Sequence, residues 1–142
     1  MKKKFEDEFM DLQSELISLC LEVTDKRIDK IYAYASIEEK SQMFNAFFEV
    51  AGEIKTLNQI VINNNLMIQF LKLGTEDLGK IKALCKEYDM EVPTELKMYY
   101  DVKNGKYNAD YQYTEVCSSA TNISAGQVFI EWINQKNQEL GK

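Results

Sequence analysis

The first apolar pattern in the chain is a stripe at helical spacing. Apolar residues recur at intervals of four and three from Phe5 to Val23, which is the period of one face of an α-helix. Acidic residues lie off the stripe, and those near its start favour the positive end of a helix dipole. We expect an amphipathic helix that ends at Thr24-Asp25-Lys26. Its buried face is predicted to consist of Phe5, Phe9, Leu12, Leu16, Leu19 and Val23.

Between residues 27 and 62 the pattern becomes that of strands. Residues 31–35 and 43–50 are rich in strand-forming residues, and the charged sequence Glu38-Glu39-Lys40 lies between them. The two runs predict antiparallel strands joined by a short hairpin. Their aromatic side chains are expected in the core; the alternative is that one strand face presents them to a partner. Residues 56–62 are expected to form a third strand or a short extended piece.

A second helix is predicted over residues 75–89. Thr75 is a suitable N-cap, because its hydroxyl can accept from a backbone N–H of the first turn, and apolar residues follow at helical spacing. The preceding Asn63-Asn64-Asn65 is typical of a turn. Residues 66–73 fit a strand or a helix, so the character of segment 56–73 stays open.

The clearest local signal is a hairpin between residues 95 and 113. Two strand-like runs flank Asn104-Gly105, the dipeptide preferred in two-residue type I′ turns. Such a turn places Val102 opposite Tyr107. One face of the hairpin is then apolar and the other polar, because side chains alternate along a strand. The polar face consists of Lys97, Tyr99, Asp101, Asn108, Asp110 and Gln112.

The last predicted element is a helix capped by Ser124, with Phe129 and Trp132 on its apolar face. The order helix, strands, helix, hairpin, helix is typical of an α+β protein. We expect a single domain over residues 1–142, an antiparallel sheet with N-terminal, central and C-terminal helices packed on its apolar face. A chain of 142 residues is long enough to bury a hydrophobic core.

The composition narrows the function classes. The chain contains no histidine, which excludes Ser-His and Cys-His nucleophile pairs and imidazole metal sites. An enzyme that uses carboxylates, Lys, Tyr or Cys is not excluded, but we predict a protein without enzymatic activity, metal or cofactor. A net charge of −6 disfavours non-specific nucleic-acid binding, so the expected partner is a protein with a basic surface.

The cysteines and the lack of export signals favour the cytoplasm. Cys20, Cys85 and Cys117 are far apart and form no CxxC motif, so we expect free thiols rather than a disulfide framework or a zinc site. Of the three, Cys117, in a polar loop, is the one expected to be exposed. The chain starts without the apolar stretch of a signal peptide, and no later segment is suited to span a membrane. The oligomeric state is not predicted.

Two surfaces are candidates for holding a basic partner. On the polar hairpin face, carboxylates beside amide and phenol groups could receive Lys or Arg; the other surface is the acidic start of the first helix. Each also has a simpler interpretation as a solvated face. The hairpin is favoured, because its groups sit on a rigid sheet. The interface candidates are Tyr99, Asp101, Asn108, Asp110 and Gln112 on the hairpin, and Glu6, Asp7 and Asp11 on the helix.

The hairpin segment also resembles a known family. Pro93-Thr94 with Leu96, the run 104–113 and Trp132 are similar to motifs of the YezG-like family of antitoxin (immunity) proteins. The first helix followed by Ile31-Tyr32-Ala33-Tyr34 agrees with the order of elements in that family. Residues 43–50 are richer in Phe than the family pattern. The shared motif is of a fold-forming kind, so it carries over no contact residues.

The resemblance implies a small cytoplasmic protein that protects its producer. Such a protein binds the toxin domain of a cognate secreted bacterial toxin, often a nuclease, and neutralises it by stoichiometric occlusion. The basic cleft with which a nuclease grips phosphates would attract an acidic protein. The alternative is a small acidic secretion chaperone for an exported effector, which would bind an unfolded segment and leave the partner's activity intact.

Overall fold

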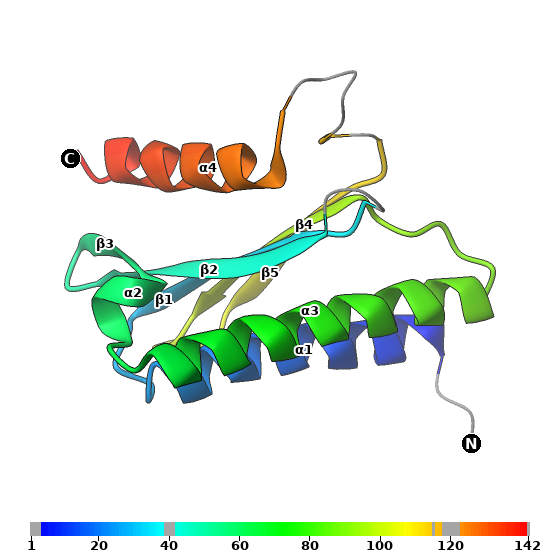
Figure 1. The fold of residues 1–142 in the computed structure, drawn as a ribbon, viewed down its shortest axis with the longest axis horizontal. Coiled ribbons are helices and arrows are strands. Elements are labelled where there is room, and N and C mark those ends of the chain that lie inside the picture. Colours follow the sequence, from blue (N-terminus) through cyan, green and yellow to red (C-terminus); the bar gives the residue numbers. More distant parts are fainter. Residues whose placement is uncertain (1–3, 39–41, 115, 118–122, 142) are drawn as a thin grey trace.

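A five-stranded antiparallel sheet forms the centre of the protein (Figure 1). The computed structural model describes residues 4–38, 42–114, 116–117 and 123–141, and its strand order is β3-β2-β1-β4-β5. The elements along the chain are α1 (Phe5–Val23), β1 (Lys30–Ser36), β2 (Met43–Val50), β3 (Glu53–Thr56), α2 (Leu57–Ile60), α3 (Asn64–Glu87), β4 (Glu95–Asp101), β5 (Tyr107–Gln112) and α4 (Ala125–Glu139).

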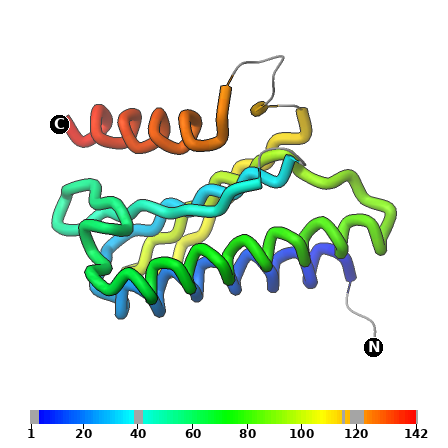
Figure 2. Tube along the Cα trace, in the orientation of Figure 1, coloured from blue at the N-terminus to red at the C-terminus, as the bar shows by residue number. Residues whose placement is uncertain are grey.

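Helices cover both faces of the sheet. The helices α1 and α3 lie side by side on one face, and α4 lies across the opposite face (Figure 1). Figure 2 shows that α1 and α3 run in opposite directions. The predicted α+β fold, with N-terminal, central and C-terminal helices on an antiparallel sheet, is confirmed. The expectation that all helices pack on one apolar face is wrong.

The central strand β1 shows why both faces need a helical cover. Every residue from Ile31 to Ser36 is buried, and alternate side chains point to opposite faces. Ile31 belongs to the core beneath α1 and α3, whereas Tyr32 belongs to the core beneath α4. Tyr32 stacks on Phe47 with ring centroids 4.7 Å apart, and Trp132 of α4 meets both rings edge-on. The predicted burial of these strand aromatics is confirmed.

The third strand lies earlier in the chain than predicted. A tight turn at Ala51-Gly52, where both residues have positive φ, joins β2 to β3, as in a type I′ turn. At Thr56 a capping box with Gln59 starts the short helix α2. The strand predicted over residues 56–62 is therefore misplaced, because this cap turns the chain from the sheet into a helix.

The helix α3 is continuous and begins well before the predicted helix. Asn63 is its N-cap, and its side-chain oxygen accepts hydrogen bonds from two backbone N–H groups of the first turn. Thr75, the predicted cap, lies inside the helix, where its hydroxyl donates to the Leu71 carbonyl at 2.8 Å. Residues 66–73, which fitted either structure, are helical.

The β4–β5 hairpin has the predicted faces but not the predicted register. Tyr100, not Val102, lies opposite Tyr107. This shift of two residues leaves each side chain on its predicted face. The loop is longer than a two-residue turn, because the Asp101 carboxylate accepts hydrogen bonds from two backbone N–H groups within it. Gly105 alone among the loop residues has a positive φ, so the predicted type I′ turn is wrong.

The buried face of α1 is centred differently from the predicted stripe. Gln13 is fully buried, together with Leu16 and Cys20. Two hairpin hydroxyls, those of Tyr107 and Tyr111, donate to the side-chain oxygen of Gln13. The oxygen of this buried amide is paired because β5 supplies these donors, which the apolar spacing of α1 alone does not indicate.

The segment before α4 is attached to the sheet by a carboxylate. Glu38 accepts hydrogen bonds from the backbone N–H groups of Val116 and Cys117, at 3.1 and 2.8 Å. Cys117 is only 3% exposed, so the prediction of an exposed thiol is wrong, and burial raises the pKa of this thiol. The predicted Ser124 cap is confirmed, as part of a capping box with Gln127 at the start of α4.

Candidate binding groove between the first and third helices

A groove runs along the outer seam between α1 and α3. Residues that line it recur along each helix at intervals of three and four, so each helix contributes one wall. Three hollows follow one another along the seam and share lining residues, so they form one continuous α1/α3 groove. The α3 wall consists of Leu66, Gln69, Leu73, Glu76, Lys80, Ala83 and Glu87, and the α1 wall of Glu8, Asp11, Glu15, Ser18 and Glu22.

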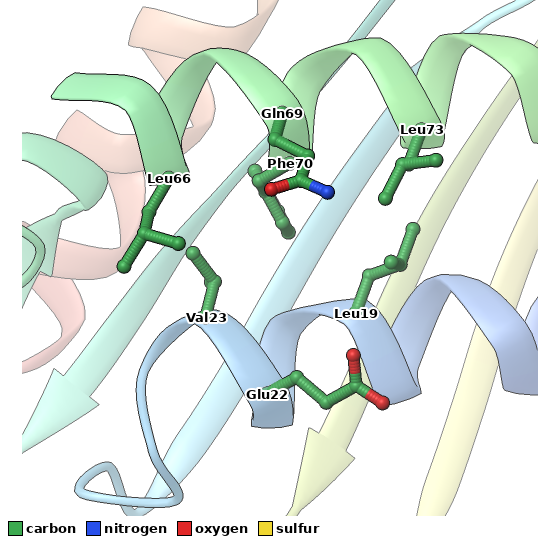
Figure 3. A pocket seen from close by; sticks show the side chains of 7 residues that line it. All are labelled: Leu19, Glu22, Val23, Leu66, Gln69, Phe70 and Leu73. Carbon is green, nitrogen blue, oxygen red and sulfur yellow. The ribbon is translucent and has the colours of Figure 1, made fainter. Parts of the chain in front are cut away.

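One end of the groove is apolar. Figure 3 shows Leu19 and Leu73 pointing toward each other across the seam, with Phe70 between the walls. Leu66 and Val23 close the end nearest the start of α3. This hollow is open to solvent, and its volume with the solvent at its mouth is about 460 Å³. Leu66 is 47% exposed and Leu73 36%, so the end offers apolar surface that the fold itself leaves in contact with water.

The middle of the groove is acidic. Asp77 lies at its base, and its carboxylate is 3.4 Å from the ammonium of Lys80. Burial, and then the neighbouring Glu15 carboxylate on α1, raise the pKa of Asp77, while Lys80 opposes this shift. Among the described residues that line the groove, Lys80 is the one cation. The carboxylates are Glu8, Asp11, Glu15, Glu22, Glu76, Asp77 and Glu87.

The far end combines an apolar base with acidic walls. Leu12 and Leu84 lie at the base, with Glu8 and Glu87 on opposite walls. The Tyr88 hydroxyl donates to Glu8 at 2.6 Å, and this hydrogen bond raises the pKa of Tyr88 to about 12. The groove thus has an apolar base at both ends and carboxylates along its walls and middle, an arrangement that can accept Lys and Arg side chains while burying apolar ones.

Only one of the acidic helix candidates lies in this groove. Asp11 lines it, whereas Glu6 and Asp7 lie exposed in the first turn of α1, outside the lining. The apolar part of the α3 wall was missed because residues 66–73 fitted either a strand or a helix. The rest of the wall, from Glu76 to Glu87, lies in the predicted helix 75–89 but was not recognised as part of a site. The signal that could have found it is the spacing of Leu66, Leu73 and the acidic residues that follow them.

The hairpin candidates lie on the opposite face of the sheet and divide into two groups. Asn108, Asp110 and Gln112 are exposed on β5. Tyr99 packs on Tyr32, with ring centroids 5.5 Å apart, and belongs to the core beneath α4. Asp101 holds the hairpin loop through its carboxylate. Two of the five candidates therefore have structural partners within the chain.

A hollow beside α4 is lined by Tyr99 and by charged side chains that pair with each other. Its lining includes an ion pair between Lys30 and Glu49 at 3.7 Å, and another between Lys136 and Glu139 at 3.1 Å. The Lys136 ammonium also lies 5.6 Å from the ring centroid of Tyr32. Because these charges pair with each other, this hollow offers a partner less uncompensated charge than the α1/α3 groove.

The described residues contain no group of three or more Cys, Asp or Glu side chains placed to hold a metal ion. No helix among them is long and apolar enough to cross a membrane. A scan against protein-family models finds no match, and a search of curated proteins finds no relative. The resemblance to the YezG-like family therefore stays a prediction.

Proposed function

We propose that this protein is an immunity protein, which binds the toxin domain of a secreted bacterial toxin in the cytoplasm of the producing cell and occludes it. The observation that carries the proposal is the α1/α3 groove, where carboxylates on both walls face one lysine. Binding of this kind requires no catalytic group and no cofactor.

The charge of the groove suits a basic partner. Carboxylates gathered along a concave surface create a local negative potential, which attracts a positively charged protein and speeds its association. The net charge of −6 adds to this effect at long range. A toxin that acts on nucleic acid presents a basic cleft, so occupying or shielding that cleft would stop its activity.

The apolar end of the groove favours a second candidate, the secretion chaperone. Leu66 and Leu73 offer exposed apolar surface beside Leu19 and Val23, and a chaperone needs such surface to hold an unfolded segment of its effector. The two functions differ in what is bound and in what happens to it. An immunity protein binds a folded toxin domain and abolishes its toxicity, whereas a chaperone leaves the activity unchanged.

Co-expression separates these functions. The protein is produced together with the C-terminal domains of large secreted toxins encoded in the same genome, and growth is measured. The proposal predicts that growth is restored with one of them and that the two proteins purify as a stoichiometric complex. It is contradicted if no toxin domain is neutralised, or if the protein stabilises only an unfolded effector segment and toxicity persists.

A further inference from the structure

We propose that the α1/α3 groove binds a basic amphipathic helix of the partner, an inference that rests on the proposed binding function. The helix would place apolar side chains against Leu19, Leu66 and Leu73 at one end of the groove. Its Lys or Arg side chains would meet the carboxylates of the middle and far end, among them Glu15 and Glu76.

The shape of the groove fits a helix. Its walls are two antiparallel helices in contact with each other, and the groove follows α1 from Glu8 to Glu22. At 1.5 Å per residue this wall is about 21 Å long, enough for about four turns of a third helix. Side chains at helical spacing on the occupant can enter between wall residues that have the same spacing.

The polarity of the groove selects the occupant. An apolar base at both ends, with carboxylates along the walls, matches a helix that is apolar on one face and basic at its flanks, the helix-in-groove mode of recognition. Nucleic acid and anionic lipid surfaces are repelled by the same carboxylates. An added β-strand finds no partner in this groove, because the backbone groups of both walls are already paired within their helices.

The uneven distribution of charge also sets which half of the bound helix lies at which end of the groove. Glu22 is the carboxylate at the apolar end, whereas acidic residues dominate from Glu15 to Glu8. The apolar half of the bound helix should therefore lie near the start of α3, and the basic half near its end. Lys80 interrupts the acidic stretch, but its ammonium is paired with Asp77 at the base.

Binding of a synthetic helix tests this inference on the intact protein. The probe is a labelled peptide of about 15 residues with Leu along one helical face and Lys at its flanks. Leu is more frequent in one half and Lys in the other, and the peptide is made in both orders. A peptide with Glu in place of Lys serves as the charge control. We expect a Leu/Lys peptide to bind in a one-to-one complex, measured by fluorescence anisotropy, and to become more helical on binding, measured by circular dichroism. The Glu peptide should not bind.

Matched variants locate the binding surface. Leu73→Asn at the apolar end, and Glu15→Lys with Glu76→Lys in the middle, should each weaken binding by at least about tenfold. Ile68→Asn changes an apolar residue of α3 that is 65% exposed and outside the groove lining. Glu6→Lys with Asp7→Lys makes the same charge change on α1 as the groove pair makes across the seam. Both controls should bind within about threefold of the parent.

The outcomes are distinct. The inference is overturned if the Leu/Lys peptide does not bind, or if groove and control variants bind it equally, which would indicate a non-specific attraction to an acidic protein. Thermal melts show that each variant is folded before it is compared. If a toxin is neutralised equally well by the groove and control variants, the helix inference fails and the immunity function stands. If the peptide binds in the groove but no toxin is neutralised, the immunity function fails.

Discussion

At the scale of single residues, Asp77 is the group whose ionisation is most closely tied to the groove. Its carboxylate is nearly buried between α1 and α3. The groups that act on it are Glu15 from α1 and Lys80 from α3. Burial and Glu15 raise the pKa of Asp77, and Lys80 lowers it; the net direction is upward. The ionised form is therefore less favoured in the folded protein than in the unfolded chain.

Replacing this carboxylate should change the pH dependence of stability. A folded-state pKa above the unfolded value gives stability that is present at acid pH and lost as pH rises through the folded pKa. We expect Asp77→Asn to be at least as stable as the parent at neutral pH, because it removes a buried charge. Its advantage should shrink below about pH 4, the ordinary range of aspartate. Urea unfolding at neutral pH and below about pH 4 measures the free energy of unfolding of the parent and the variant. A variant clearly less stable than the parent at neutral pH would contradict this prediction.

Gly105 gives a second prediction at this scale. Its φ of +72° lies in the left-handed region, which a β-branched residue adopts only with strain. We expect Gly105→Val to lower the free energy of unfolding by about 1–2 kcal/mol, measured by chemical denaturation. Gly105→Asn should cost less, because Asn tolerates positive φ. An unchanged midpoint for the Val variant would show that the loop can adopt another conformation at no cost.

At the scale of elements, α3 joins the groove to the sheet, and its glycines show which side packs tightly. Gly74 lies against the ring of Phe44 on β2, and a Cβ at this position would collide with the ring. Gly79 has no neighbouring atom in the way of a Cβ. The same substitution should therefore have opposite effects at the two positions.

Alanine at each position provides the comparison. Gly79→Ala should stabilise the protein by about 0.5–1 kcal/mol, because alanine is the better helix former. Gly74→Ala should destabilise it by about 1–3 kcal/mol, the usual cost of overpacking. The difference in melting temperature between the two variants measures this. Equal effects would mean that α3 can move away from β2 freely.

Local sequence signals predicted some of the helices and strands and not others. Local signals sufficed for α1, for β1 and β2, for the Ser124 cap and for the two faces of the hairpin, because periodicity and capping depend on neighbouring residues. The hairpin register was wrong because the Asp101 side chain, not the Asn104-Gly105 preference, shapes the loop. The second helical layer was missed because it depends on long-range pairing, which puts Tyr32 and Trp132 together.

Only part of the candidate groove could be predicted from the sequence. Asp11 could be identified, since the acidic face of α1 follows from helical spacing. On α3, the acidic part of the partner wall lies in the predicted helix 75–89, but its apolar part was not predicted, because residues 66–73 carry no decisive helical signal and the Asn63 cap resembles a turn. The contact between the two helices joins residues far apart in the chain, and no local pattern encodes it.

At the scale of the whole molecule, charge should govern the rate at which a partner arrives. The attraction between exposed charges is screened within about 8 Å at physiological salt. We expect association with the toxin domain to slow as salt rises, while dissociation changes less. Stopped-flow or surface-based kinetics over a salt series measures both rates. An association rate independent of salt would leave the apolar end of the groove as the main contact.

Charge-reversal variants compare the two candidate surfaces, the polar face of the hairpin and the α1/α3 groove. Asp101→Lys with Asp110→Lys alters the hairpin face, and Glu15→Lys with Glu76→Lys alters the groove by the same net charge. The groove pair should slow association more, because its charges belong to a concave acidic surface, whereas Asp101 is already engaged by the hairpin loop. A larger effect of the hairpin pair would move the interface to the other face of the sheet.

The α1/α3 groove is proposed to hold the toxin domain that this protein would neutralise. Growth rescue from a co-expressed toxin domain tests it most directly, with Glu15→Lys/Glu76→Lys compared with the matched control Glu6→Lys/Asp7→Lys at equal protein levels. We expect the control to protect as well as the parent and the groove variant to protect poorly or not at all. Full protection by the groove variant would contradict it.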